Sequence, residues 1–429
     1  MKHHLMHPCD LIVMYMKRVY FYGMTTTSGG NISLLDEQRS MWITPAAVDK
    51  AKLRAEDIVR VRADGTVTGL HRPSSEFPFH QAIYAARPDV GAVIHAHPSA
   101  LVAFSIVRER PDTNILAQAA DICGQVGFAP YATPGSAELG ENIARAFAEG
   151  HDSVLLENHG VVCAGRTMEE AYQRFETLDF CARLIIKARM IGPYRVLTPD
   201  QIQMFRRHRP ELPEFTPEQH TNKEKKLRKF IREIVHRAYD QQIMTSTEGV
   251  VSARVGPDAF LITPTGQDRR YLTEEDLVLV SGGQRENGKL PSRSTPLHKK
   301  VYERHPETKA ICSAQGPSVT AFAVTEGPFD TRTIPESYAM LREAPKFPYG
   351  AQFSENDTLA EALSAECPAV LLENDATLVT GGSLLEAYDR LEVAEFTAQS
   401  LLNALPLGQL ISMGDEQISL LRESHLFRR

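Results

Sequence analysis

Two histidines one residue apart lie in the apolar segment GAVIHAHPSA, residues 91–100. The apolar run predicts a buried strand, in which side chains two positions apart point to the same side of the sheet. We therefore expect His95 and His97 to project together, as two metal ligands would. A third imidazole, His159, follows a second apolar run in the segment LLENHG. Three neutral imidazoles and an open fourth position are typical of a catalytic zinc site.

Each of these histidines, taken alone, is more often a hydrogen-bonded core residue than a metal ligand. A second copy of the segment, KAICSAQGPS at residues 309–318, argues against that interpretation. Ser313 and Gln315 stand there in place of the two neighbouring histidines, and Asp375 stands in place of His159. Because one copy lacks all three imidazoles, we expect the three to serve one function.

Glu76, in the segment PSSEFPFH, is the candidate for proton transfer. It lies where a helix is expected to begin, so the attraction between a carboxylate and a helix N-terminus is the alternative explanation. Ser294 takes its place in the second copy, and a serine caps a helix equally well but cannot act as a base. The joint loss of Glu76 and the histidines predicts that they share one site.

The loop TSGGNIS, residues 27–33, combines glycines, an amide and hydroxyls, which are the groups found in anion-binding turns. A plain glycine-rich turn is the more common cause of such a sequence. With Ser74 and Ser75 next to Glu76, however, the loop is expected to form the far end of a substrate pocket.

The elements that must position these residues occur twice in the chain of 429 residues. Residues 41–61 align with residues 260–280, and later blocks keep the same order and spacing. Each copy alternates helices with short apolar strands, which predicts a sheet covered by helices. We expect a first domain at residues 1–191, a linker at residues 192–222 and a degenerate second domain at residues 223–429.

The composition is that of a soluble globular protein, with 42% hydrophobic and 24% charged residues. A formal net charge of -7 argues against nucleic acid as a partner, because phosphates require a basic surface. The six cysteines form no CxxC pair, which indicates buried thiols in a reducing compartment. No apolar run approaches the length of about 18 residues that spans a membrane. We therefore expect a cytoplasmic protein without a membrane partner.

The motifs SGGNIS, ITP, SSE, HAHP and ENHG follow one another in the first copy, and on them the chain resembles the class II aldolase/adducin family. The resemblance covers residues 10 to about 191, with a degenerate copy from residue 223 to about 413. It implies a three-layer α/β/α sandwich around a mainly antiparallel sheet, present twice. It also implies homo-oligomers, often four-fold rings, with active sites at the subunit borders.

The resemblance further implies roles for individual residues. The divalent metal, usually zinc with manganese or another ion as the alternative, would be held by His95, His97 and His159. Glu76 would be the acid/base. The substrate phosphate or carboxylate would be held by Gly30, Asn31, Thr44, Ser74 and Ser75.

Two departures from the family pattern bear on the substrate. The family's TPSG or TPTG phosphate turn reads TPAA here and ends at Ala47, which is strained if that position needs a positive φ. The tyrosine acid of the phosphate aldolases has no match at residues 116–118. Tyr338, in the corresponding segment of the second copy, is the candidate, with packing beneath the helix layer as the alternative.

These observations predict a metal-dependent lyase that cleaves a carbon–carbon bond in a small sugar, sugar phosphate or hydroxy-keto acid through a metal-stabilised enediolate. A sugar-phosphate epimerase or decarboxylase on the same scaffold, and a non-catalytic adducin-like assembly module, are the alternatives. We expect two chains to form a pseudo-four-fold assembly, in which the degenerate copy takes a neighbour's place.

Overall fold

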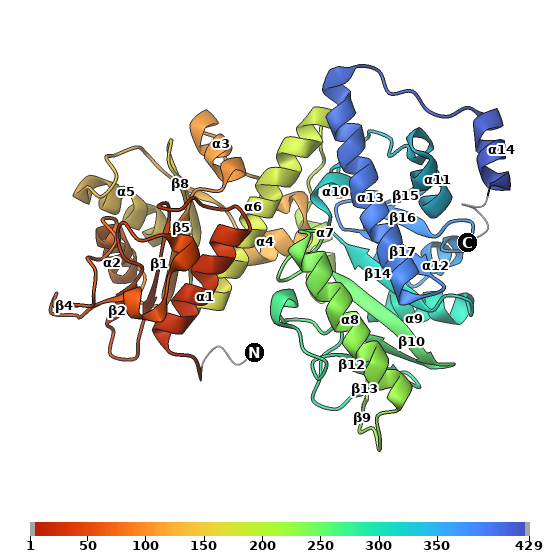
Figure 1. Cartoon of the computed structure of the whole chain (residues 1–429), viewed down its shortest axis with the longest axis horizontal. Coiled ribbons are helices and arrows are strands. Elements are labelled where there is room, and N and C mark those ends of the chain that lie inside the picture. The colour runs from red at the N-terminus through yellow and green to blue at the C-terminus, as the bar shows by residue number, and fades with distance from the viewer. Residues whose placement is uncertain (1–4, 425–429) are drawn as a thin grey trace. The chain divides into compact units, whose positions relative to one another are not determined.

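The computed structural model describes residues 5–424 (Figure 1). Within these residues the chain forms two compact units. The first unit comprises the residues up to 183 except 115–117, and the second comprises residues 115–117 together with those from 184 onward. Each unit is described by itself below.

The first unit is built on an eight-stranded sheet with the order β4-β3-β2-β1-β5-β8-β7-β6. Its strands are β1 (Asn31–Leu35), β2 (Met41–Ile43), β3 (Val59–Val61), β4 (Val67–Thr68), β5 (Ala92–Ala96), β6 (Gly127–Ala129), β7 (Ser153–Leu156) and β8 (Gly160–Gly165). Only β6 and β7 pair in parallel, and the other neighbours are antiparallel. The predicted, mainly antiparallel sheet is confirmed, with one parallel pair at its edge.

Six helices accompany this sheet: α1 (Pro8–Phe21), α2 (Phe77–Ala86), α3 (Ser99–Val107), α4 (Ala117–Cys123), α5 (Ala137–Ala148) and α6 (Met168–Ile191). Helices α2 and α5 pack on one face, where Ile83 and Phe147 join a buried core with Val93 of β5. Helix α1 meets α6 through Tyr15 and Tyr172, whose ring centroids lie 5.0 Å apart. Burying apolar side chains in this way is the main stabilising contribution to such a core.

The second unit repeats this sheet order and adds one strand, giving β15-β16-β17-β14-β10-β11-β12-β13-β9. Its strands are β9 (Glu214–Phe215), β10 (Val250–Gly256), β11 (Ala259–Ile262), β12 (Val278–Ser281), β13 (Gln284–Glu286), β14 (Ala310–Ala314), β15 (Lys346–Phe347), β16 (Ala369–Leu372) and β17 (Thr377–Gly381). Its helices are α7 (Pro199–Arg207), α8 (Asn222–Asp240), α9 (Thr295–Arg304), α10 (Pro317–Ala323), α11 (Pro335–Leu341), α12 (Thr358–Ala362), α13 (Leu384–Ala404) and α14 (Asp415–Glu423).

Successive residues of this second sheet enter two different cores, as expected when side chains alternate between faces. Val250 packs with Leu297 of α9, whereas Val251 packs with Ile234 of α8 and Leu391 of α13. The sheet therefore has helices on both faces, and the predicted three-layer α/β/α sandwich is confirmed.

The segment at residues 192–222, predicted to be a linker, contains two regular elements. Thr198 caps α7 by accepting a hydrogen bond from the Gln201 amide, and the Gln201 side chain accepts one from the Thr198 amide. Strand β9 extends the second sheet by pairing in parallel with β13. This segment therefore contributes to the second unit. None of the helices between residues 5 and 424 combines the length and apolar composition that crossing a bilayer requires.

Candidate metal centre and proton-transfer site

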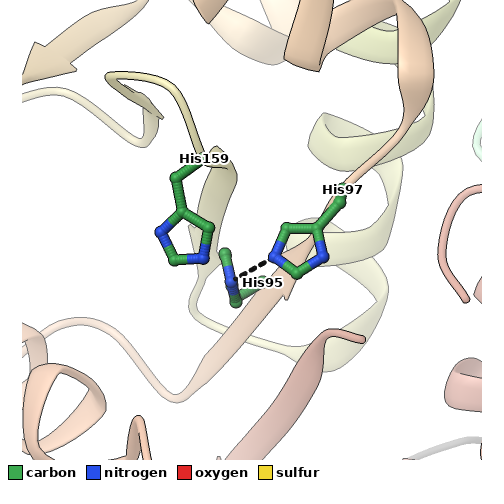
Figure 2. Close-up of side chains that lie close together, drawn as sticks. All are labelled: His95, His97 and His159. Carbon is green, nitrogen blue, oxygen red and sulfur yellow. Dashed lines mark hydrogen bonds between the residues drawn. The ribbon is translucent and has the colours of Figure 1, made fainter. Parts of the chain in front are cut away.

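Three imidazoles meet at one end of the first sheet, as Figure 2 shows. His95 lies on β5, where it pairs with Asn31 of β1 on one side and with Val162 of β8 on the other. His97 follows the end of β5, and His159 lies in the tight turn between β7 and β8. The sheet order places β5 next to β8, and this brings the two apolar segments of the sequence together.

The ring nitrogens of the three histidines are close enough to share one ion. One nitrogen from each ring lies within 4.8 Å of those of the other two, and the Nε2 atoms of His95 and His97 are 3.0 Å apart. The Nδ1 of His95 lies 2.9 Å from the carbonyl oxygen of Val161, to which it can only donate a proton. In a neutral ring this leaves the Nε2 lone pair of His95 free to face the other imidazoles.

His97 and His159 are both neutral at physiological pH. Burial, followed by the proximity of His95, lowers the pKa of His97 to about 3 and that of His159 to about 4. At neutral pH both rings therefore keep a lone pair available for a cation.

Glu76 faces the same centre from the residue that precedes α2. Its Oε2 lies 3.3 Å from Nε2 of His95, and its Oε1 lies 3.5 Å from Nε2 of His159. The Asn31 Nδ2 group donates a hydrogen bond of 2.8 Å to Oε2. Glu76 is buried but makes no side-chain capping hydrogen bond to α2, so helix capping does not explain its position.

The carboxylate of Glu76 is ionised in this environment. Burial acts to raise its pKa, but the positive charge that the His95 and His159 rings carry when protonated, together with the hydrogen bond from the Asn31 amide, outweighs burial and holds the pKa well below its usual range. Among the described residues, its buried Oε1 has no hydrogen-bond partner. The three imidazole nitrogens form a donor set that fits a divalent cation such as zinc, and the carboxylate oxygen without a partner lies beside them.

The residues predicted to bind substrate lie close to this centre but differ in exposure. Gly30 has a φ of +71°, and a Cβ there would lie 2.8 Å from the His95 carbonyl oxygen, so only glycine fits. The buried Thr44 hydroxyl accepts a hydrogen bond from the Ile32 amide. Ser74 Oγ accepts one from the Glu76 amide, whereas Ser75 is exposed. Their roles toward a substrate stay predictions.

The turn that departs from the family pattern does need a positive φ. Ala47 has a φ of +57°, and Gly266, its counterpart in the second repeat, has a φ of +72°. Because an alanine in this region is strained, the first repeat maintains the turn at a cost that the second repeat avoids.

The corresponding position of the second repeat is filled by carboxylates and amides. Asp375 accepts a hydrogen bond of 3.0 Å from Gln352, and burial raises the pKa of Asp375 to about 6. Burial and the proximity of Asp375 raise the pKa of Glu248 to about 8, although Arg269 and Arg293 act in the opposite direction. The residues described there include no imidazole at the positions of the three histidines.

Tyr338, the predicted acid from the second repeat, is almost fully buried in α11. Its hydroxyl accepts a hydrogen bond of 2.6 Å from Nη2 of Arg422, within the same repeat. These contacts agree with the packing alternative, and the role of Tyr338 as an acid stays a prediction.

Three residues near the centre were not singled out individually from the sequence. A Cβ on Gly160 would lie 2.6 Å from Cδ2 of His97, and a Cβ on Gly29 would lie 3.0 Å from its Nδ1. The third, His80, is buried beside Asn31. The glycines could have been found from their positions in SGG and NHG, but His80 has a histidine counterpart, His298, so the comparison of the repeats did not single it out.

Comparison with known proteins agrees with the two repeats. The profile of the Class II Aldolase and Adducin N-terminal domain matches residues 10–186 and again residues 230–402. A 5-deoxy-D-ribulose 1-phosphate aldolase from Bacillus thuringiensis serovar kurstaki is 32% identical over 195 residues, which are 45% of this chain and 90% of that protein. A 3-oxo-tetronate 4-phosphate decarboxylase from Pectobacterium atrosepticum is 32% identical over 189 residues, 42% of this chain and 84% of that protein.

Among solved structures, an L-fuculose 1-phosphate aldolase has 32% sequence identity and a TM-score of 0.42, over 46% of this chain and 93% of that one. The two profile matches together span most of the sequence. The chain therefore belongs to the class II aldolase and adducin family, whose domain it contains twice, once with three converging histidines and once without them.

Proposed function

We propose that the first repeat is a metal-dependent lyase that cleaves a carbon–carbon bond in a small phosphorylated hydroxycarbonyl compound. The observation that carries this proposal is the convergence of three imidazoles on the ionised carboxylate of Glu76. A structural metal site needs ligands but no base, whereas metal-dependent bond cleavage next to a carbonyl uses both a cation and a proton carrier.

The residues of the chain divide this work among them. His95, His97 and His159 would hold the cation through their ring nitrogens. When bound, a divalent cation polarises a carbonyl and stabilises the negative charge that develops on its oxygen. Glu76 would accept a proton from the substrate at Oε1, the oxygen without a hydrogen-bond partner, and return it after the bond is broken.

The nature of the substrate is supported from two sides. The aldolase and the decarboxylase described above both act, by their names, on phosphorylated compounds. In this chain Asn31 begins the first strand beside the centre, Gly30 directly precedes it, and Ser75 is exposed near it. These groups would bind the phosphate, although Ala47 alters the neighbouring turn.

A decarboxylase of a phosphorylated 3-oxo acid is the second candidate. It is favoured by the similarity to the 3-oxo-tetronate 4-phosphate decarboxylase and by the absence of a tyrosine at residues 116–118. Loss of carbon dioxide leaves the same negative charge beside a carbonyl, so it would use the same cation and carboxylate.

Product analysis separates the two candidates. The full-length protein, loaded with zinc or manganese, is incubated with ketose 1-phosphates, free ketoses and phosphorylated 3-oxo acids. Release of an aldehyde from a ketose phosphate supports the lyase, and release of carbon dioxide supports the decarboxylase. If no member of the panel reacts, or if products form equally fast with Glu76→Gln, the proposed function is wrong.

We also propose that the protein acts as a homo-oligomer, with two chains arranged with pseudo-four-fold symmetry. The retained fold of the second repeat, despite its missing ligands, supports this proposal. The molar mass in solution, measured by light scattering, tests it, because a monomer would contradict it.

A further inference from the structure

A row of buried polar groups extends from the core of the first repeat to Glu76. His80, which is fully buried on α2, lies with its Nδ1 2.7 Å from the Ser33 hydroxyl oxygen. That oxygen is also 2.7 Å from the Tyr84 hydroxyl. At its other side, His80 hydrogen-bonds through Nε2 to Oδ1 of Asn31. The Asn31 amide then reaches the carboxylate of Glu76.

The carboxylate end of this row fixes the direction of every hydrogen bond in it. An ionised carboxylate can only accept, so the Nδ2 group of Asn31 must face Glu76, and Oδ1 must face His80. An amide oxygen can only accept as well, so His80 must carry its proton on Nε2. Burial lowers the pKa of His80 to about 3, so the ring is neutral and its Nδ1 must accept.

The directions of the hydrogen bonds made by Ser33 and Tyr84 follow from this assignment. Since Nδ1 of His80 accepts, the Ser33 hydroxyl donates to it. The single proton of Ser33 is then used, and the Tyr84 hydroxyl must donate to Ser33. Burial raises the pKa of Tyr84 well above its usual range, which keeps this donor protonated. All bonds of the row therefore point from Tyr84 toward Glu76.

The second repeat contains the inner part of this row without its outer part. Ser252 lies 2.8 Å from Nδ1 of His298 and 2.8 Å from the Tyr302 hydroxyl, as in the first repeat. Val250, however, takes the place of Asn31. Among the residues that the structure describes, Nε2 of His298 has no hydrogen-bond partner.

A buried polar nitrogen without a partner costs free energy, so the second repeat retains this histidine despite a penalty. The inner part of the row therefore serves the fold in both repeats. Only the first repeat, which also has Glu76 and the three histidines, uses Nε2 as a donor.

We propose that His80 is a positioning residue that fixes the orientation of the Asn31 amide, and through it the carboxylate of Glu76. This inference rests on the proposed role of Glu76 in proton transfer. With His80 in place, a flipped amide would bring its oxygen against the carboxylate and would leave the Nε2 proton of His80 facing a donor. Without His80, Oδ1 of Asn31 loses its donor, and within the row only the bond to Glu76 holds the amide in place.

The direction of the row can be tested without any substrate. Nitrogen NMR of the full-length protein, labelled with ¹⁵N-histidine, distinguishes the two neutral tautomers, and the resonance lost in His80→Gln identifies His80. The proton should be on Nε2, and the ring should remain neutral between about pH 5 and pH 8, where exposed histidines titrate. A proton on Nδ1 would mean that Asn31 presents its oxygen to Glu76, and it would overturn the proposal.

Two substitutions of His80 separate positioning from packing. The side-chain amide of glutamine in His80→Gln can place a donor where Nε2 is, whereas His80→Asn reaches only the position of Nδ1 and its partner Ser33. His80→Asn should lower the turnover number roughly ten- to a hundred-fold, the size expected for losing a hydrogen bond in a charged network. KM should change less than the turnover number. His80→Gln should retain most of the turnover.

The matched controls are His298→Asn and His298→Gln in the second repeat. They make the same two changes next to Ser252 and should lower the thermal unfolding temperature as the His80 variants do, but they should leave turnover unchanged. If His80→Asn turns over as fast as His80→Gln, or if both are as active as the wild type, His80 only packs. If the wild type is inactive on every substrate, the proposed function fails, and the NMR measurement still decides the direction of the row.

Discussion

The Oε2 atom of Glu76 lies 3.3 Å from Nε2 of His95, so the predicted base and the buried ligand of the predicted metal face each other directly. In the second repeat Ser294 and Ser313 stand at these two positions. A carboxylate and an imidazole have thus been retained together in one repeat and are absent together from the other. This pairing makes the roles of the two residues separable by substitution.

Glu76→Gln should leave the metal content unchanged and lower turnover by about two orders of magnitude or more, because loss of a general base commonly costs this much. Glutamine keeps an oxygen that can accept the hydrogen bond from Asn31, so the local structure should persist. Steady-state kinetics and elemental analysis measure the two effects. Ser294→Ala is the control at the equivalent position and should match the wild type. Wild-type turnover in Glu76→Gln would show that another group moves the proton.

The chain should bind about one equivalent of divalent metal, the count implied by a single three-histidine site. His95→Ala combined with His97→Ala should abolish tight binding, because one imidazole cannot replace three. Ser313→Ala combined with Gln315→Ala, at the equivalent positions, should bind as the wild type does. Mass spectrometry of the dialysed protein gives the count. Two equivalents in the wild type, or metal retained by the double histidine variant, would contradict the assignment.

The sequence predicted the fold well because its signals are local or repeated. Alternation of apolar residues predicts strands, and the duplicated blocks fixed which elements correspond between the halves. His95, His97 and His159 could be grouped because all three change in the second repeat. The same comparison could not single out His80, whose counterpart His298 is also a histidine but lacks an asparagine partner. The two histidines differ in a hydrogen bond, which His80 of α2 makes to Asn31 of β1 and His298 does not make. The identity of the two histidines alone does not reveal this difference.

The structured part of residues 192–222 was missed for a different reason. Its composition is rich in proline and charge, which is typical of linkers. Helix α7 nevertheless forms there, with a capping pair, and the guanidinium of Arg293 lies 3.4 Å from the ring centroid of Phe205 on this helix. Tertiary contacts of this kind outweigh a weak local signal.

The buried carboxylates of the second repeat should make its stability depend on pH. The pKa of Glu248 is raised from 4.5 to about 8, so the folded state favours the protonated form. Its contribution to the free energy of unfolding is therefore fully present below about pH 4.5 and is lost as the pH rises through 8. Asp375, raised from 3.8 to about 6, acts in the same direction at lower pH.

Glu248→Gln retains a neutral side chain at every pH and should remove most of this dependence. Thermal unfolding of both proteins between pH 5 and pH 8 should show the variant gaining stability relative to the wild type as the pH rises. Glu56→Gln, at a position where the side chain is 57% exposed, is the control and should follow the wild type. A constant difference between Glu248→Gln and the wild type would show that Glu248 is already ionised in the fold.

The turn at Ala47 offers a reciprocal pair of substitutions. Ala47 has a φ of +57° and Gly266 a φ of +72°, so the same backbone conformation carries an alanine in one repeat and a glycine in the other. Ala47→Gly should raise the free energy of unfolding of the first repeat by up to about 1 kcal/mol, because it removes the steric cost of a Cβ at positive φ.

Gly266→Ala should destabilise the second repeat by a similar amount. A Cβ at Gly266 would have no atom within 4 Å outside the immediate chain, so strain in the backbone would be its main effect. Urea unfolding, followed by circular dichroism, gives both changes, and the fluorescence of the single tryptophan, Trp42, reports on the first repeat. If both substitutions shift stability in the same direction, strain in this turn is not what distinguishes the two repeats.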